Sequence, residues 1–198
     1  SPSTTLREVF TQGKSVPALI AVSQDASGTA WPRVRALGAA VGCAKAGLLE
    51  STFREEVEAD LFGEQAIHAG GFLELLLSAY EVAVDAGYPP ELAYFECIHE
   101  IKMIADLLYE GGFAYTHNII SPTASFGGLR GGKRVVDDHV RENMRRILAE
   151  IQSGEFARAW KEEREAGFST FRKRIEEIAS HPAEEVGKKL RASMYRDD

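Results

Sequence analysis

A single strand-like segment, followed by a long stretch of helical periodicity, limits the folds open to this chain. Residues 16–22 (VPALIAV) form a nearly continuous apolar run that ends in turn-like residues 23–28, as is typical of a buried parallel strand. A parallel strand needs neighbours to pair its backbone groups, and the sequence offers one other weak candidate, around residues 46–50. The pattern therefore predicts an all-α protein with one orphan strand near its N-terminus.

From residue 32 onward, apolar residues recur at helical spacing. We expect helices near residues 32–42, 51–69, 72–86, 90–110, 135–152, 155–165, 168–180 and 183–193. The prolines of Gly87–Pro90 suit the end of one helix and the first turn of the next, and Gly111-Gly112 is expected to end another. The segment from His117 to Arg134 is rich in Gly, Ser, Thr and Pro, so we expect a long loop whose glycine-rich part acts as a flexible lid.

Composition excludes several classes of function. The chain has 198 residues and a net charge of −7, with its basic residues interleaved among acids, which argues against a nucleic-acid surface. No window approaches the roughly 20 uncharged apolar residues of a bilayer span, and the N-terminus lacks the layout of a secretory signal. We expect no membrane partner and a soluble, cytoplasmic protein, with Cys43 and Cys97 as reduced thiols.

Two acid pairs lie on the apolar faces of their predicted helices. With about 100° per residue and Phe53 at zero, Asp60 and Glu64 fall at about 340° and 20°, inside the apolar stripe. In the predicted helix at residues 90–110, Glu96 and Glu100 fall on the apolar side. That side also carries Leu92, Met103 and Leu107. The four carboxylates are therefore predicted to point at the core.

Four core-directed carboxylates require a cation. Burying one ionised carboxylate costs several kcal/mol unless it is compensated, and neighbouring carboxylates repel one another. Few basic side chains lie on these faces, so we predict divalent metal, and an all-oxygen ligand set favours Mg²⁺ or Mn²⁺ over Zn²⁺. Either spacing alone usually marks a solvated helix face, but two pairs on apolar stripes favour a site for two ions.

The acid pairs lie within longer motifs: residues 49–65 (LESTFREEVEADLFGEQ), 93–102 (AYFECIHEIK) and 106–112 (DLLYEGG). Further motifs follow at residues 16–28, 119–127, 151–160 and 181–192. Together they resemble the C-terminal domain of short-form ketol-acid reductoisomerases over nearly the whole chain. The resemblance implies the interwoven, knotted helical domain of that family.

The resemblance also implies an enzyme of branched-chain amino-acid biosynthesis. Such enzymes convert 2-acetolactate or 2-aceto-2-hydroxybutyrate, both 2-hydroxy-3-keto acids, to a 2,3-dihydroxy acid by a Mg²⁺-dependent alkyl shift and reduction by NADPH. Carried over, Asp60 would bridge two Mg²⁺ ions, Glu64 would ligate one of them, and Glu96 would serve the second. Glu100 would hold metal-bound water or substrate oxygen and take part in proton transfer. Asp60 and Glu100 are thus the implied catalytic residues, and Ser121 and Glu100 the implied substrate-binding residues.

The family further implies an NADPH-binding domain and a homodimer. Its N-terminal Rossmann domain binds NADPH, and no G-x-G-x-x-G follows a strand here. We expect residues 1–30 to be a remnant of the linker and last strand of that domain, and residues 31–198 to form the metal- and substrate-binding, dimerising domain. No cofactor-binding residue is assigned, because NADPH would bind through a separate or removed domain. The family implies a homodimer in which the two acid pairs of one site come from different subunits.

The chain departs from the family pattern at several positions. Ser23 and Thr4 replace histidines, His68-Ala69 replaces Leu-Cys, and Pro122 and Ser125 replace the Asn and Glu that usually follow the serine. The last two leave substrate identity open. Two alternatives remain: a free-standing relative that acts on a related hydroxy-keto acid without NADPH, and a non-catalytic helical dimerisation module. His99 is predicted to be structural. His68 is predicted to lie at the edge of the core, with a role as a ligand or as a partner of the ligands as the alternative.

Overall fold

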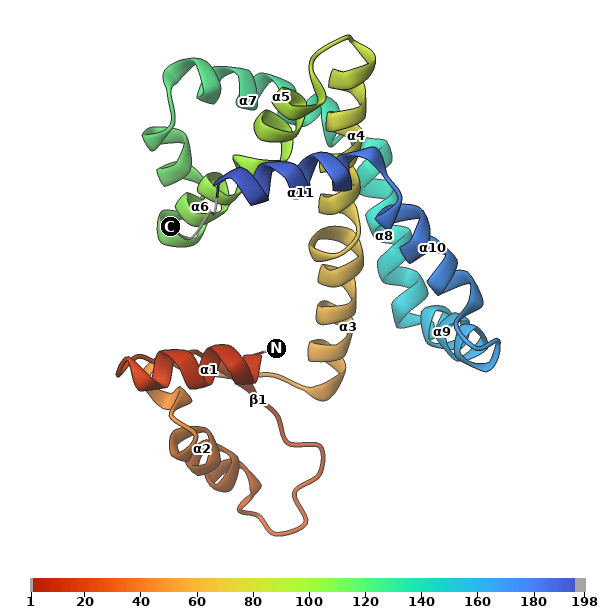
Figure 1. Ribbon diagram of the computed structural model, residues 1–198. Coiled ribbons are helices and arrows are strands. Elements are labelled where there is room, and N and C mark those ends of the chain that lie inside the picture. Colours follow the sequence, from red (N-terminus) through yellow and green to blue (C-terminus); the bar gives the residue numbers. More distant parts are fainter. Residues whose placement is uncertain (1, 195–198) are drawn as a thin grey trace. The chain divides into compact units, whose positions relative to one another are not determined.

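The computed structural model describes residues 2–194, and these are mostly helical (Figure 1). The chain divides into two compact units, Ser1–Leu61 and Phe62–Asp198, which are described separately. In the described residues the one sheet consists of two three-residue strands, so the predicted all-α fold class is confirmed. The assignment of residues 1–30 to a domain remnant stays a prediction.

The N-terminal unit contains a small β-α-β arrangement. Its elements are α1 (Pro2–Thr11), β1 (Ala18–Ile20), α2 (Ala30–Ala40), the 3-10 turn η1 (Cys43–Lys45), β2 (Leu48–Glu50) and most of α3 (Phe53–Gly63). β1 and β2 pair in parallel, with Ala18 opposite Leu48 and Ile20 opposite Glu50. Parallel strands need a crossover connection, which α2 supplies.

The prediction of an orphan strand is therefore wrong. Its partner is β2, which lies in the segment that the sequence marked as a weak candidate. The strand signal there was weak because β2 is short and ends in a charged residue, Glu50. A glycine brings the crossover helix onto this strand: a Cβ on buried Gly38 would lie 2.8 Å from Cδ2 of Leu48. The pairing thus depends on a close approach between α2 and β2 that the strand pattern itself does not reveal.

The C-terminal unit consists of helices. They are the π-helical turn η2 (Glu64–His68), α4 (Gly71–Asp85), α5 (Pro90–Tyr94), the π-helical turn η3 (Phe95–His99), α6 (Ile101–Ile119), α7 (Pro122–Val135), α8 (Asp138–Gln152), α9 (Glu155–Glu165), α10 (Ser169–Ala179) and α11 (Pro182–Met194). Pro90 begins α5 after Gly87, which has φ +92, as the Gly-Tyr-Pro-Pro motif predicted. The predicted helices are confirmed within a few residues, apart from two regions.

The predicted loop and flexible lid at residues 117–134 are wrong, because most of this segment is helix α7. Ser121 caps the helix, since its Oγ accepts a hydrogen bond from the backbone N–H of Ala124 at 3.2 Å. Pro122 occupies the first turn, where a missing N–H costs nothing, and basic residues end the helix. These end signals outweigh the low helix propensity of the glycines.

The prediction that Gly111-Gly112 ends a helix is also wrong. α6 continues to Ile119 with a kink at Gly112, which has φ +78 and ψ −173. Thr116 supports the kink by donating a hydrogen bond from its Oγ1 to the carbonyl of Gly112 at 3.0 Å. A Cβ on Gly111 would lie 2.1 Å from Cγ of Tyr115, so a side chain does not fit there. The glycine pair therefore bends the helix without ending it. The hydrogen bond from Thr116 spans the bend.

The core of the C-terminal unit lies where α4, α5 and α11 meet. Buried Tyr80, Ala93 and Ala183 form its centre, and the ring of Tyr80 packs edge-on against Tyr94 with 6.5 Å between centroids. Burial raises the pKa of the Tyr80 phenol, and the charge of Glu91 adds to the effect. The three helices are thus joined mainly by apolar and aromatic packing.

α11 packs closely on α5 because Gly187 has no side chain (Figure 1). A Cβ on Gly187 would lie 2.4 Å from Oη of Tyr94, and this glycine is buried. Arg191, one turn further along α11, donates a hydrogen bond to the same Oη at 2.9 Å. Two successive turns of α11 therefore hold the phenol of Tyr94, directly before the π-helical turn η3.

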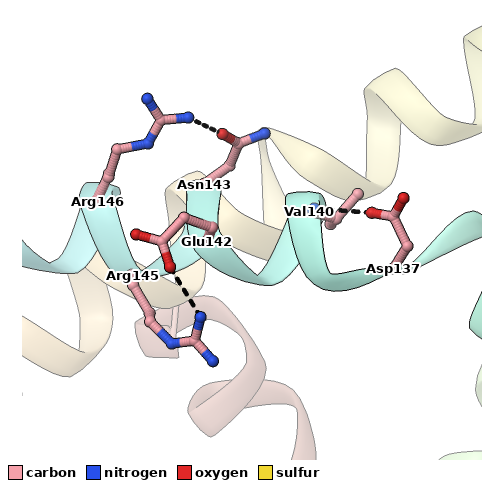
Figure 2. A network of polar contacts seen from close by, with 6 residues as sticks. All are labelled: Asp137, Val140, Glu142, Asn143, Arg145 and Arg146. Atoms are coloured by element: carbon pink, nitrogen blue, oxygen red, sulfur yellow. Dashed lines mark hydrogen bonds and ion pairs between the residues drawn. The ribbon is translucent and has the colours of Figure 1, made fainter.

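Several local contacts lie along α8 (Figure 2). They join Asp137 to Val140, Glu142 to Arg145, and Asn143 to Arg146. Such contacts between residues three apart stabilise the helix without linking it to another element. The apolar side of α8, with Met144 and Ile147, lines a cavity of about 610 Å³ within the C-terminal unit.

One stretch, Phe53–Asp85, is by length and composition apolar enough for a membrane span, with a mean hydropathy of 1.3 in one window of 18 residues. It is not one regular helix, because Gly70 has φ −106 and ψ −95 just before α4. α4 itself has 15 residues, fewer than the roughly 20 that a bilayer span needs. The hydropathy comes from apolar side chains that a single chain leaves exposed, such as Leu73 and Val82.

We predict that Gly187→Ala lowers the free energy of unfolding by about 1–3 kcal/mol, because the new methyl group overlaps Tyr94. Urea unfolding followed by circular dichroism, at one protein concentration, measures the effect. Gly131→Ala is the matched control, since this glycine lies in α7 with nothing within 4 Å of an added Cβ. Equal stability of the two variants would show that the contact between α11 and Tyr94 is not tight.

Candidate metal and substrate site

Each acid pair lies at a π-helical turn. Asp60 belongs to the last part of α3 and Glu64 begins η2, while Glu96 lies in η3 and Glu100 directly follows it. The π-type bonds are present in both turns: the N–H of Ala69 donates to the carbonyl of Glu64 at 2.9 Å, and that of Glu100 to the carbonyl of Phe95 at 3.1 Å. Sequence reasoning missed these turns, because apolar periodicity over a few residues does not separate a π turn from an α turn.

The wider turn changes how side chains four residues apart are aligned. In an α-helix such side chains are offset by about 40° around the axis. A π turn takes up an extra residue, so the offset between Glu96 and Glu100 differs from that in a regular α-helix. π turns are uncommon and occur often at functional sites, so two of them at two acid pairs favour a shared chemical purpose.

All four carboxylates are exposed, so the prediction that they point at the core of the chain is wrong. Their apolar neighbours on the same faces are exposed as well: Phe53 is 59%, Val57 48% and Met103 65% accessible. The helical wheel correctly placed acids and apolar residues on one face, but it does not report what covers that face. In a single chain nothing among the described residues covers it fully.

One chain does not bring the two pairs together. Among residues 2–194, no three His, Cys, Asp or Glu side chains lie close enough to hold one metal ion. The donors themselves suit Mg²⁺, because they are carboxylate oxygens that water reaches. These donor types fit Mg²⁺ chemically, although the described residues of one chain do not gather three of them.

The histidines that end both π turns fold back on their own turns. The ring of His99 stacks on Phe95 with 5.2 Å between centroids. His68 lies against its own helix, since a Cβ on Gly63 would be 3.3 Å from its Cε1. The stacking of His99 agrees with its predicted structural role, whereas His68 is exposed and does not lie at the edge of the core.

Ser121 combines a structural and a potential binding role. Its Oγ accepts the N–H of Ala124 as the cap of α7, which leaves its hydroxyl proton for another acceptor. Ser121 is exposed, and the adjoining helix terminus carries a partial positive charge that favours an anion. Pro122, a departure from the family, fits this first turn. Of the other departures, Ser23 is exposed, and the side chain of Thr4 lies outside the described part of the chain.

We predict that Ser121→Ala destabilises α7 by about 0.5–2 kcal/mol, because the N–H of Ala124 loses its cap. Amide hydrogen exchange in the first turns of α7 measures this loss locally. Ser121→Asn is the control, since its side-chain oxygen restores a cap. Unchanged exchange in Ser121→Ala would contradict the capping role.

Comparisons with known proteins place the whole chain in one family. The profile described as "Ketol-acid reductoisomerase, C-terminal domain" matches residues 53–196, and that described as "Acetohydroxy acid isomeroreductase, NADPH-binding domain" matches residues 1–47. The "Ketol-acid reductoisomerase (NADP(+))" of Saccharopolyspora erythraea is 51% identical over 193 residues, covering 98% of this chain and 58% of the relative.

A solved structure agrees. The NADH-preferring ketol-acid reductoisomerase from an uncultured archean superimposes with a TM-score of 0.91 at 40% identity, covering 98% of this chain and 58% of that one. The chain thus spans somewhat more than half the length of these relatives. The matched profile, the sequence identity and the shared fold together establish that this chain belongs to the ketol-acid reductoisomerase family.

Proposed function

We propose that this chain forms the metal- and substrate-binding part of a ketol-acid reductoisomerase of branched-chain amino-acid biosynthesis. The substrates would be 2-acetolactate and 2-aceto-2-hydroxybutyrate, which become 2,3-dihydroxy acids. One observation carries the proposal. Two exposed acid pairs, Asp60 with Glu64 and Glu96 with Glu100, each lie at a π turn in the region matched to the family's C-terminal domain.

Within this proposal each side chain has a separate task. Asp60, Glu64, Glu96 and Glu100 would hold two Mg²⁺ ions, which would supply Lewis-acid polarisation of the substrate carbonyl. Glu100 would accept or donate a proton at a substrate oxygen. Ser121 would donate its hydroxyl proton to the substrate carboxylate, next to the positive end of α7.

The reduction needs a nicotinamide that the rest of the family fold binds. The first 47 residues match part of the NADPH-binding domain, and the match covers β1, α2 and η1 but ends just before β2. We propose NADPH as the reductant, because the relative with 51% identity is named for NADP(+). In this proposal, no described residue of the chain is assigned to binding the nicotinamide.

We further propose that two copies of the chain build each site. Large apolar side chains are left exposed by one copy, including Tyr109 at 93%, Phe113 at 79% and Val82 at 70%. Among the described residues, no large side chain is less than 2% accessible. Nε2 of Gln65 is buried at the cavity without a hydrogen-bond partner in the described part. A second copy would cover this apolar surface, supply such a partner and bring the missing acid pair.

The metal assignment predicts that Asp60→Asn and Glu100→Gln each weaken Mn²⁺ binding by more than about tenfold, because each removes a charged ligand. Titration calorimetry or the loss of the free Mn²⁺ resonance signal measures the affinity. Glu110→Gln is the control, as an exposed glutamate of α6 outside both pairs. Normal affinity in Asp60→Asn would mean that the ligand assignment is wrong.

Shared sites predict a specific result for mixed chains. Asp60→Asn and Glu100→Gln chains, unfolded together and refolded, should recover roughly a quarter of the original Mn²⁺ capacity, because half of the molecules are hybrids with one intact site each. Separately refolded samples are the control and should recover none. Recovery in neither sample, with sedimentation at the 21.7 kDa mass of one chain, would contradict the dimer.

A further inference from the structure

A hydrogen bond joins α6 to α7 just behind the proposed substrate serine. Nδ1 of His117, in the last turn of α6, lies 3.1 Å from Oγ of Ser125 in α7. Both side chains are half-buried. The ring also reaches the next turn of α7, since a Cβ on Gly128 would lie 3.8 Å from its Cε1. His117 therefore contacts α7 at Ser125, and its ring lies beside the helix toward Gly128.

Ser125 connects this contact to Ser121. The backbone N–H of Ser125 donates to the carbonyl of Ser121 at 2.9 Å, so the two serines are one helical turn apart. Residues four apart lie on the same side of a helix, which puts Ser121 on the face that His117 contacts. A continuous path of hydrogen bonds thus runs from His117 through Ser125 to the residue that caps α7.

The chemistry of this path is that of a neutral hydroxyl. Ser125 meets the imidazole with its Oγ, and α7 contains no acidic residue. A hydroxyl can pair with the imidazole whether His117 is neutral or protonated, because it both donates and accepts. It also adds no negative charge one turn from a serine that would bind a carboxylate.

We propose that His117 is a positioning residue for Ser121. Through Ser125, it fixes the first turn of α7 and so holds the Ser121 hydroxyl in the direction needed for the substrate carboxylate. This inference rests on the proposed function for the role of Ser121. The contact itself rests only on the geometry of α6 and α7.

The test compares Ser125→Thr with Ser125→Val, which have the same shape and differ in the hydroxyl. The probe is 2,3-dihydroxyisovalerate, titrated into the chain in excess Mg²⁺. We expect Ser125→Thr to bind like the unsubstituted chain and Ser125→Val to bind roughly three- to tenfold more weakly, as for one lost hydrogen bond. His117→Phe should show the same loss, and the His117→Phe, Ser125→Val double variant no further loss, because both remove one interaction.

A second measurement separates the positioning role of His117 from the proposed function of the chain. Amide exchange in the first turn of α7, without ligand, should be faster in Ser125→Val and His117→Phe than in Ser125→Thr. Equal exchange in all variants would overturn the positioning role, as would equal ligand affinity of Ser125→Val and Ser125→Thr. No binding by the unsubstituted chain, with the exchange difference intact, would instead overturn the proposed function and leave His117 as a residue that holds α7.

Discussion

Apolar faces that one chain does not cover are the physical constraint on this structure. In the C-terminal unit, α4, α5 and α11 meet around Tyr80, and little else in the described residues is deeply buried. The acid pairs lie on faces that share this exposure, beside residues such as Val57 and Met103. In the proposed dimer, the hydrophobic effect would favour a second copy over the same faces that carry the carboxylates, so that assembly and the proposed chemistry would use one surface.

Local backbone geometry prepares the acid pairs for such a role. Both pairs lie at π turns, and the turn that carries Glu96 follows directly after Tyr94. Tyr94 is held by the close approach of Gly187 and by the hydrogen bond from Arg191. The C-terminal helix thus fixes the start of a turn that would carry metal ligands, although α11 contributes no ligand itself. Rigid support of this kind is what a metal site requires for its geometry.

The substrate side of the proposed site has a different support. Ser121 lies at the start of α7, and the position of that helix relative to α6 depends on the kink at Gly112 and on the pair formed by His117 and Ser125. Ser125 keeps this connection neutral, which suits the approach of a carboxylate. The proposed substrate serine is therefore held without an acidic side chain in α7.

The sequence by itself determined the family, the positions of most helices, and which residues share a helix face. Asp60 and Glu64 were placed on one face because periodicity is a local property of the chain. The tertiary structure alone decided that β1 pairs with β2, that residues 122–135 form a helix, and that the acid pairs lie at π turns. It also decided that their faces are exposed and that His117 meets Ser125. These features depend on residues far apart in sequence, or on small shifts in backbone bonding, and the order of apolar and polar residues records neither.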